Sequence, residues 1–415
     1  MKTIGLIIGV LFGLLISGNS YAQEYLDKYL KTAAENNPGL KAKFNDYLSV
    51  VEKAPQIGTI PDPVVAFGYF ISPVETRVGP QNFVISAAQT FPWFGKLSTA
   101  EDAVIELANS KLEVFEDARS KLFYDIKSAY YNLYFVQKGI GITRENIDIL
   151  STFRQLALIK LESGKASAVD ELRVEMEIAD IEDQLAYLLD SKYQLEVKFN
   201  NLLNVDNQSE IVLPTVLLNE GLSFSRSQLM DSIAANNHGI KQIEHRILSW
   251  ENRRYSARKS EGPSFSIGLD YINVGKIDNP SLELSQNGKD VFLAKVGISI
   301  PLYSRKYDGM IQEASFQIES ASFEKIDKVN QLNTLFELGY RDFRDGERRI
   351  ALYIKQLQLA KNALDILLAE YSTDGQNFEE VLRMERKVLK YELELDKARA
   401  DNNAAVAFID YLLGK

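Results

Sequence analysis

The sequence contains no cysteine, two histidines and five methionines among its 415 residues. A chain without cysteine has neither a disulfide nor a thiolate ligand for a soft metal ion. His238 and His245 stand without a recognisable nucleophile partner, so acid–base and nucleophilic catalysis are disfavoured. Metalloprotease (HExxH), nucleophile-elbow (GxSxG) and Walker-type motifs are also missing. The sequence therefore predicts no enzyme, no cofactor and no metal site.

Long apolar runs are scarce too, and none after the N-terminus is long enough for a transmembrane helix. The run at residues 4–16 is itself too short to span a membrane. It follows Lys2 and precedes the small-residue pattern Ser-Tyr-Ala at 20–22, which is typical of a secretory signal cleaved after Ala22. A mature start at Gln23 offers no cysteine for a lipid anchor. We expect export across a bacterial inner membrane, with an uncleaved anchor as the alternative.

The charge balance disfavours one class of partner. With 47 basic and 57 acidic residues the net charge is −10, and nothing in such a chain offsets repulsion from nucleic-acid phosphates. Only 11 prolines accompany 25% charged residues, a composition that suits long helices.

The chain repeats itself. The hexapeptide NNPGLK at 36–41 recurs as NNHGIK at 236–241, and the junction FPWFGK at 91–96 recurs in order as IPLYSRK at 300–306. Duplication explains this recurrence better than coincidence. We expect a signal peptide at 1–22, a first repeat at 23–202, a linker at 203–225 and a second repeat at 226–415.

Each repeat contains two segments in which apolar and polar residues alternate, as in half-buried strands. Each segment is close to the roughly 9–11 residues that cross a bilayer when tilted. The four predicted strands are 64–71, 83–91, 265–274 and 291–300.

Each strand pair is followed by long stretches with apolar residues at helical spacing, interrupted once by a glycine-containing break. The breaks lie at 161–167 and 371–377. This pattern predicts two helical hairpins packed as coiled coils, at 97–202 and 307–413.

The apolar face of the strands needs a cover. Packing the strands against the helices would leave most of each long helix uncovered, because it extends far beyond a ten-residue strand. Lipid could cover the apolar face of the strands if the sheet closed into a barrel. Single-chain barrels begin at about 8 strands, so several copies must close it, giving 8 strands for a dimer or 12 for a trimer. Asp270 and Lys295 would then face the lumen. An interfacial aromatic girdle is expected at Phe91, Trp93, Phe94 and Tyr303, unless these residues cap a soluble core.

This order of elements resembles the TolC-type outer-membrane efflux proteins, over residues 24–413. The resemblance implies a mainly α fold with a transmembrane β-barrel segment, closing as a trimeric 12-stranded barrel above an α-helical periplasmic tunnel. It implies the outer membrane of a Gram-negative bacterium, and a passive exit duct for drugs or metal cations in a tripartite pump. The partners would be a periplasmic adaptor and an inner-membrane transporter. The junction QTFPWFGKL at 89–97 is similar to the heavy-metal efflux branch.

The resemblance also implies roles for the hairpin ends. Contact with the adaptor is expected at Gly164, Lys165, Ala168, Asp170, Leu172, Gly375, Gln376 and Leu382. An acidic aperture is expected at Asp170, Asp374, Glu379 and Glu380. The alternative is that these acids only favour a helix N-terminus. Arg383 and Gln376 depart from the family pattern, which puts gating by side chains at those positions in doubt.

Two other functions fit the sequence. A duct of a type I protein secretion system would share every feature above. A periplasmic coiled-coil tether or adhesin stalk would explain the helices, but not four alternating strands of bilayer length.

Overall fold

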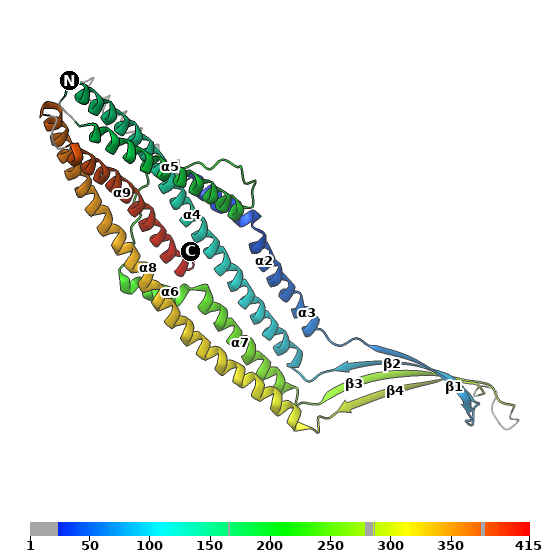
Figure 1. Cartoon of the computed structure of the whole chain (residues 1–415). Coiled ribbons are helices and arrows are strands. Elements are labelled where there is room, and N and C mark those ends of the chain that lie inside the picture. Colours follow the sequence, from blue (N-terminus) through cyan, green and yellow to red (C-terminus); the bar gives the residue numbers. More distant parts are fainter. Residues whose placement is uncertain (1–23, 165–166, 279–284, 286, 375–377) are drawn as a thin grey trace, which may run out of the picture. The chain divides into compact units, whose positions relative to one another are not determined.

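The computed structural model describes residues 24–164, 167–278, 285, 287–374 and 378–415 (Figure 1). The predicted signal peptide at 1–22 lies outside the described residues. After a helical segment at 24–36, the first half contains α2 (Pro38–Val51), α3 (Lys53–Gly58), β1 (Val64–Val74), β2 (Gln81–Phe91), α4 (Lys96–Glu162) and α5 (Ala168–Leu203). The second half contains α6 (Arg226–Asn236), α7 (His238–Lys259), β3 (Ser264–Val274), β4 (Val291–Ser299), α8 (Ser304–Asp374) and α9 (Phe378–Leu412). The order of elements in one half therefore repeats in the other.

The chain divides into two units. The first comprises Met1–Ala42, Phe115–His238 and Val329–Lys415, and it holds both helical hairpin ends. The second comprises Lys43–Val114 and Gly239–Lys328, and it holds all four strands. Each unit is treated by itself below.

The repeated asparagine motif makes the same contact in both halves of the first unit. The Nδ2 of Asn37 donates to the carbonyl of Leu202 at 3.0 Å, near the end of α5. The Nδ2 of Asn237 donates to the carbonyl of Leu412 at 3.0 Å, at the end of α9. Helix C-termini leave carbonyls without an intrahelical donor, so each asparagine supplies one. In each half, the motif therefore connects the end of the return helix, α5 or α9, to the start of the helix that follows the motif, α2 or α7.

A core of tyrosines lies in the middle of the first unit. Tyr130, Tyr131 and Tyr134 of α4 are buried together with Phe199 of α5. The hydroxyl of Tyr131 donates to Glu220 at 2.9 Å, and the hydroxyl of Tyr130 donates to the carbonyl of Val212 at 3.2 Å. These bonds fix the segment between the repeats on α4. None of the helices that the structure describes combines the length and the apolarity needed to cross a membrane.

The second unit contains one antiparallel sheet with the strand order β1-β2-β3-β4. The observed strand ends lie within three residues of those predicted from alternation. β1 and β4 are the edge strands, and each pairs with a single neighbour among the described residues. Their outer backbone groups are therefore open to pairing.

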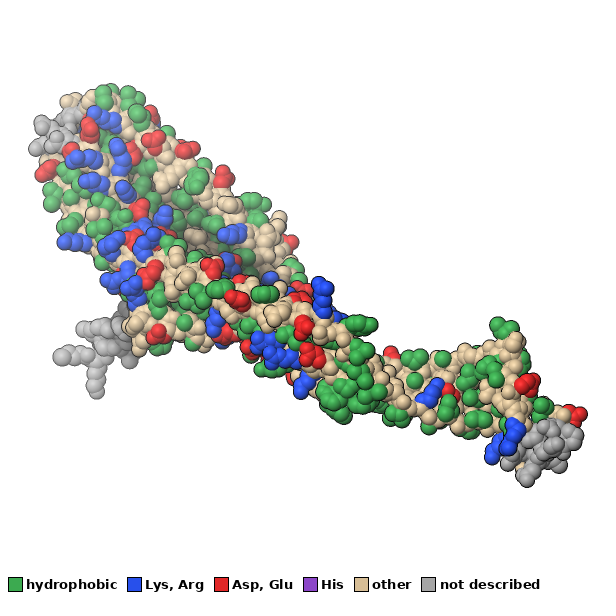
Figure 2. Space-filling view, turned by 90° about the horizontal axis from the view of Figure 1, so that it is seen from below, with side chains coloured by type: hydrophobic (Ala, Val, Ile, Leu, Met, Phe, Trp, Pro, Cys, Tyr) green, Lys and Arg blue, Asp and Glu red, His purple; other side chains and the backbone are tan. Residues whose placement is uncertain are grey.

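The register gives the sheet two different faces. On one face Phe67 pairs with Ile85, Ile85 with Tyr271, and Tyr271 with Phe292. This face continues through other exposed apolar residues, including Val65, Tyr69, Ile267, Leu269, Val296 and Ile298. Figure 2 shows apolar side chains at the surface of the strand region. Among the described residues nothing covers this apolar face, so a soluble core beneath the strands is not what buries it.

Candidate functional site

The end of the first hairpin is a capped helix start. Gly164 has φ +70°, a left-handed conformation that favours glycine. Ser167 caps α5: its Oγ accepts from the backbone N of Val169 at 3.2 Å, and its own N donates to Asp170 Oδ2 at 3.3 Å. Sequence reasoning missed Ser167, although the Ser-x-x-Asp spacing signals this capping box. Lys165 lies outside the described residues.

The end of the second hairpin is closed by apolar packing. α8 ends at Asp374 and α9 begins at Phe378, so predicted Gly375 and Gln376 lie outside the described residues. Tyr371 and Phe378 are buried with ring centroids 4.6 Å apart. Burial raises the pKa of the Tyr371 hydroxyl, and the charge of Asp170 adds to the rise.

A lysine that sequence reasoning missed joins the two hairpin ends. Lys160 of α4 is buried, and its Nζ donates to the carbonyl of Ser372 at 3.0 Å. The same Nζ lies 5.1 Å from the centroid of the Tyr371 ring, within cation–π range. A lone lysine near a helix end gives no sequence signal for such a contact.

The predicted docking leucines differ in exposure. Leu172 of α5 is 56% exposed, and Ala168 beside it is exposed as well. Leu382 of α9, its counterpart in the repeat, is 1% exposed and packs in a cluster with Tyr371, Phe378 and Val381. Leu382 is thus a core residue of the hairpin rather than a surface residue.

Three of the four predicted aperture acids, Asp170, Glu379 and Glu380, lie beside arginines, and the side chain of Asp374 lies outside the described part of the structure. Arg173 lies 3.5 Å from Asp170 and 3.1 Å from Glu379, which joins α5 to α9. Glu380 pairs with Arg383 on α9. These pairs are largely exposed, so each contributes little to stability, but they lower the net negative charge of the site. Arg383, which departs from the family pattern, is one of the neutralising groups.

The predicted lumen residues Asp270 and Lys295 lie together on the second face of the sheet. Lys295 Nζ is 2.5 Å from Asp270 Oδ2. Ser86 is the register partner of Asp270, and Gly268 is the partner of Lys295. The structure therefore separates a face carrying this ion pair from the apolar face opposite, as the alternation predicts.

The predicted girdle residues lie at the junctions between strands and helices. Trp93 stacks on Phe265 with ring centroids 6.0 Å apart, and a Cβ at Gly262 would lie 2.3 Å from the Trp93 ring. Phe94 and Tyr303 are exposed. Trp93 thus connects the end of β2 to the start of β3, and contact of these residues with lipid stays a prediction.

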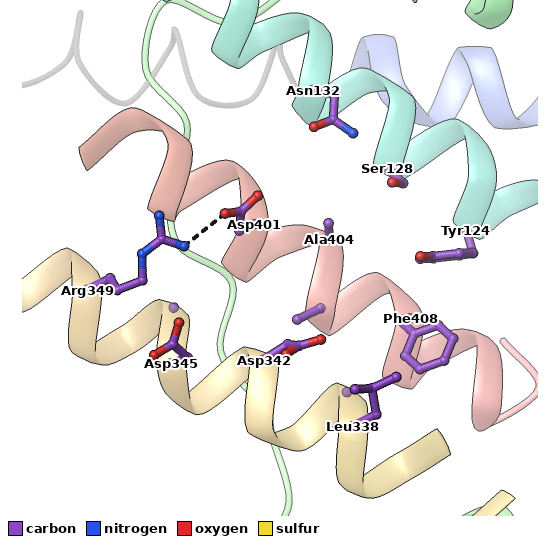
Figure 3. A pocket seen from close by; sticks show the side chains of 13 residues that line it. Tyr124, Ser128, Asn132, Leu338, Asp342, Asp345, Arg349, Asp401, Ala404 and Phe408 are labelled. Atoms are coloured by element: carbon purple, nitrogen blue, oxygen red, sulfur yellow. Dashed lines mark hydrogen bonds and ion pairs between the residues drawn. The ribbon is translucent and has the colours of Figure 1, made fainter. Parts of the chain in front are cut away.

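A groove in the helical unit carries acidic side chains. Figure 3 shows it between α4 and α8, with α9 as its floor. Asp342, Asp345 and Asp401 line it beside Tyr124, and Arg349 donates to Asp401 at 3.0 Å. The groove is lined in full by Tyr124, Ser128, Asn132, Leu338, Gly339, Asp342, Asp345, Gly346, Arg349, Asp401, Ala404, Ala405 and Phe408. Sequence reasoning did not find this groove, because it depends on how three distant segments pack.

Metal-ligating residues do not gather in the described part of the chain, where no group of three or more His, Cys, Asp or Glu side chains could hold a metal ion. His245 Nδ1 lies 2.7 Å from Glu106 Oε2. His238 begins α7, and its Nε2 lies 3.2 Å from the carbonyl oxygen of Gly414. Both histidines thus contact protein groups.

Comparison with curated proteins gives distant matches. No protein-family profile matches the chain. The chain is 22% identical over 262 residues to the toxin and drug export protein A of Aggregatibacter actinomycetemcomitans, covering 62% of this chain and 55% of that protein. It is 20% identical over 245 residues to an uncharacterized protein of Haemophilus influenzae, covering 58% and 53%. The matches thus span about half the length of these curated relatives.

Comparison with solved structures gives matches over nearly the whole chain. The outer membrane protein VceC of Vibrio cholerae has a TM-score of 0.76 at 15% identity, covering 95% of this chain and 98% of VceC. The MtrE outer membrane channel of Neisseria gonorrhoeae has a TM-score of 0.75 at 16% identity, covering 94% and 89%. The CmeC outer membrane channel of Campylobacter jejuni has a TM-score of 0.73 at 12% identity, covering 94% and 86%.

These matches define the fold. The chain has the fold of these outer-membrane channel structures. The resemblance to TolC-type proteins that the repeat order predicts is confirmed at the level of the fold.

Proposed function

We propose, from the premise that the chain has the fold of outer-membrane channels, that it is the outer-membrane duct of a tripartite efflux pump. One observation carries the proposal: the four-stranded sheet has an uncovered apolar face, an opposite face with an Asp–Lys pair, and two open edges. Lipid solvates such an apolar face only if every backbone group is paired, which requires a closed barrel. A sheet with two open edges closes by joining copies edge to edge.

Three copies, each with four strands, would give a 12-stranded barrel. In that arrangement β4 of one copy pairs with β1 of the next. The helical unit supports the same closure, since α5 has an exposed side with apolar residues such as Met176, Tyr187 and Tyr193. A neighbouring copy would cover that side, and outer-membrane location follows from the barrel.

Edge-to-edge closure can be tested by cysteine crosslinking, because the chain has no cysteine of its own. A chain carrying two cysteines, one on β1, for example at Ala66, and one on β4, for example at Gly297, should yield disulfide-linked dimers and trimers. The matched control is the pair Leu269 and Ala294, which are register partners within one copy. That pair should crosslink without any increase in mass. Exclusively monomeric products from every edge pair would refute the closure.

The wet face of the barrel would carry Asp270 and Lys295, and the acidic groove of Asp342, Asp345 and Asp401 would lie on the bore of the tunnel. The groove lies across α9 from the segment between the repeats, which Asn403 binds through the carbonyl of Leu218 at 2.7 Å. Charged walls keep a bore hydrated and favour counter-ions. If the protein is a duct, the purified protein should produce an ion conductance when it is added to a planar bilayer. A preparation of assembled protein that never conducts would contradict the duct.

The hairpin ends would dock a periplasmic adaptor, which in turn joins an inner-membrane transporter. The proposed surface uses Gly164, Lys165, Ala168, Asp170, Leu172, Gly375 and Gln376, and leaves out the buried Leu382. Asp374, Glu379 and Glu380, together with Asp170, would border the aperture, with Arg173 and Arg383 balancing part of its charge.

Docking can be tested by changing the exposed leucine. Leu172→Asp should abolish crosslinking to the adaptor while the barrel still assembles, because the side chain is exposed and the change leaves the core intact. Val212→Asp, on the segment between the repeats, provides an exposed apolar control far from the hairpin ends. If Leu172→Asp keeps its crosslinks, docking lies elsewhere.

A second candidate is the exit duct of a type I protein secretion system. It is favoured by the name of one relative, a toxin and drug export protein. Deleting the gene should distinguish the efflux duct from the secretion duct. Increased sensitivity of the cells to small toxic compounds favours the efflux duct, and loss of a secreted protein favours the secretion duct. A periplasmic tether or adhesin stalk predicts neither effect and no conductance.

A further inference from the structure

A carboxyl group that the duct does not need is buried in the second hairpin. Glu385 of α9 is 2% exposed, among the buried Val381, Leu382 and Val388. A buried carboxylate normally has a cation or several hydrogen-bond donors beside it, because water no longer solvates its charge. Glu385 has one such donor. The Nδ2 of Asn146 on α4, itself 5% exposed, donates to Glu385 Oε1 at 2.6 Å.

The remaining oxygens of this pair lack partners. Among the described residues, neither Glu385 Oε2 nor Asn146 Oδ1 has a hydrogen-bond donor, and both atoms are buried. Thr143, one turn before Asn146, also has a buried Oγ1 without a partner. If Glu385 were ionised, Oε2 and Oδ1 would be two buried acceptors with no hydrogen between them, which is costly.

Among the described residues, neighbouring cations compensate for that charge only in part. On α8, Lys361 is engaged with Glu392 at 2.6 Å, and on α5, Glu177 is engaged with Arg386 at 2.8 Å. On α4 the charged residues beside Asn146 are exposed: Arg144, Glu145 and Asp148. Burial raises the pKa of Glu385 and Glu392 adds to the rise, while the Asn146 bond and Lys361 oppose it.

We propose that Glu385 and Asn146 form a proton-binding site that latches α9 to α4. The proton resides on Glu385 Oε2 and is donated to Asn146 Oδ1, while Asn146 Nδ2 donates to Oε1. A neutral carboxylic acid and a primary amide are complementary in this way, since each offers one donor and one acceptor. Release of the proton to solvent leaves the carboxylate facing an amide oxygen, and the contact between α4 and α9 loosens.

The direction of the pH effect follows from linkage. Because the folded chain holds this proton more tightly than the unfolded chain, the packing of α9 is most stable at acidic pH. That stability is lost as pH rises from the ordinary glutamate value of 4.5 through the raised pKa of Glu385. Within that window the equilibrium constant for local opening rises by up to about tenfold per pH unit. The latch lies one turn from Leu382, so it acts on the hairpin end whether or not the chain is a duct.

The test is hydrogen exchange of the purified full-length protein between pH 5 and pH 8, corrected for intrinsic exchange, with Glu385→Gln as the variant. Glutamine keeps the shape and supplies the missing donor at every pH. We expect opening of peptides covering 378–395 to rise with pH in the natural chain and to be flat in Glu385→Gln. Glu175→Gln is the matched control, since Glu175 is the exposed counterpart of Glu385 in the repeat, and it should leave the profile unchanged.

Two further variants keep Glu385 in place. Glu392→Gln removes a negative charge and should lower the midpoint of the profile, whereas Lys361→Met removes a positive charge and should raise it. The infrared carbonyl band of a protonated carboxyl should be present below the midpoint and absent in Glu385→Gln. Identical pH profiles for the natural chain and Glu385→Gln would overturn the proposal. Midpoints unmoved in both charge variants would do the same if Glu385→Gln fails to fold.

Discussion

The return helices of the two hairpins, α5 and α9, have nearly the same length but different surroundings. α5 buries six of its 36 residues, whereas α9 buries sixteen of its 35. Both stand at the same place in the predicted repeat, and each contains a Leu-Arg pair, at 172–173 and 382–383. The difference therefore reflects position in the fold rather than two different kinds of helix.

The partners of each helix explain the difference. α9 contacts α8 through Arg349 and Glu394, and α4 through Asn146 and Glu385 (Figure 1). α5 contacts α4 through Arg154, and α9 through Arg173. α4 is the counterpart of α8 in the repeat, so each return helix contacts the long helix of its own hairpin. Among the described residues α5 lacks a second long helix in the place that α4 takes beside α9. The repeat implies that such a neighbour exists, and a second copy of the chain could supply it.

The largest expected difference is between the matched leucines. Leu382→Ala should destabilise the protein by about 2–5 kcal/mol, because it leaves a cavity in a packed cluster. Leu172→Ala should cost about 0.5 kcal/mol or less in an isolated subunit, since its side chain is exposed. Denaturant unfolding at a fixed protein concentration measures both. A larger cost for Leu172→Ala in the assembled protein would show that another copy covers α5, and equal costs in isolated subunits would contradict the burial difference.

The two motif asparagines should differ by less. Asn237→Ala removes the donor to the Leu412 carbonyl from a buried site, and we expect a loss of about 1–3 kcal/mol. Asn37 makes the equivalent bond to the Leu202 carbonyl but is less buried, so Asn37→Ala should cost about 0.5–1.5 kcal/mol. Thermal unfolding of the two variants under identical conditions tests the order, and a reversed order would contradict it.

The sequence predicts much of this fold because its patterns are local. Alternation over 265–274 places β3 within one residue of its observed start, since side chains in a strand alternate strictly between faces. The spacing of apolar residues predicts α4 and α8 for the same reason. The face carrying Asp270 and Lys295 also follows from alternation, and the structure pairs the two residues.

The rest depends on packing between distant segments, which local patterns do not encode. Leu172 and Leu382 are each followed by an arginine at matched places in the repeat, yet only α9 contacts a second long helix, α4, besides that of its own hairpin. Asn146 and Glu385 are separated by 239 positions, and nothing in either segment marks them as a pair. Local patterns do not predict the ion pair between Arg173 and Glu379 either, although both residues border the predicted acidic aperture.

A moderate effect is expected at the start of α5. Its first turn is held by the Ser167 cap, whereas the first turn of α9 is held by Phe378 against Tyr371. Ser167→Ala should cost about 0.5–2 kcal/mol of local stability. Hydrogen exchange of peptides starting at 168 measures the change, with Ser167→Thr as a control that keeps the capping oxygen. Equal exchange in the alanine and threonine variants would show that the cap contributes nothing at this end.

The smallest effect is expected at Glu175, the exposed counterpart of Glu385. Its Oε1 lies 2.7 Å from Arg154, and both side chains are more than two-fifths exposed. Glu175→Gln should therefore change the free energy of unfolding by less than about 1 kcal/mol. The change should shrink further at 1 M salt, where the Debye length is about 3 Å. A loss of several kcal/mol that does not depend on salt concentration would mean that another copy buries this pair. The difference in burial between α5 and α9 would then exist only in the isolated subunit.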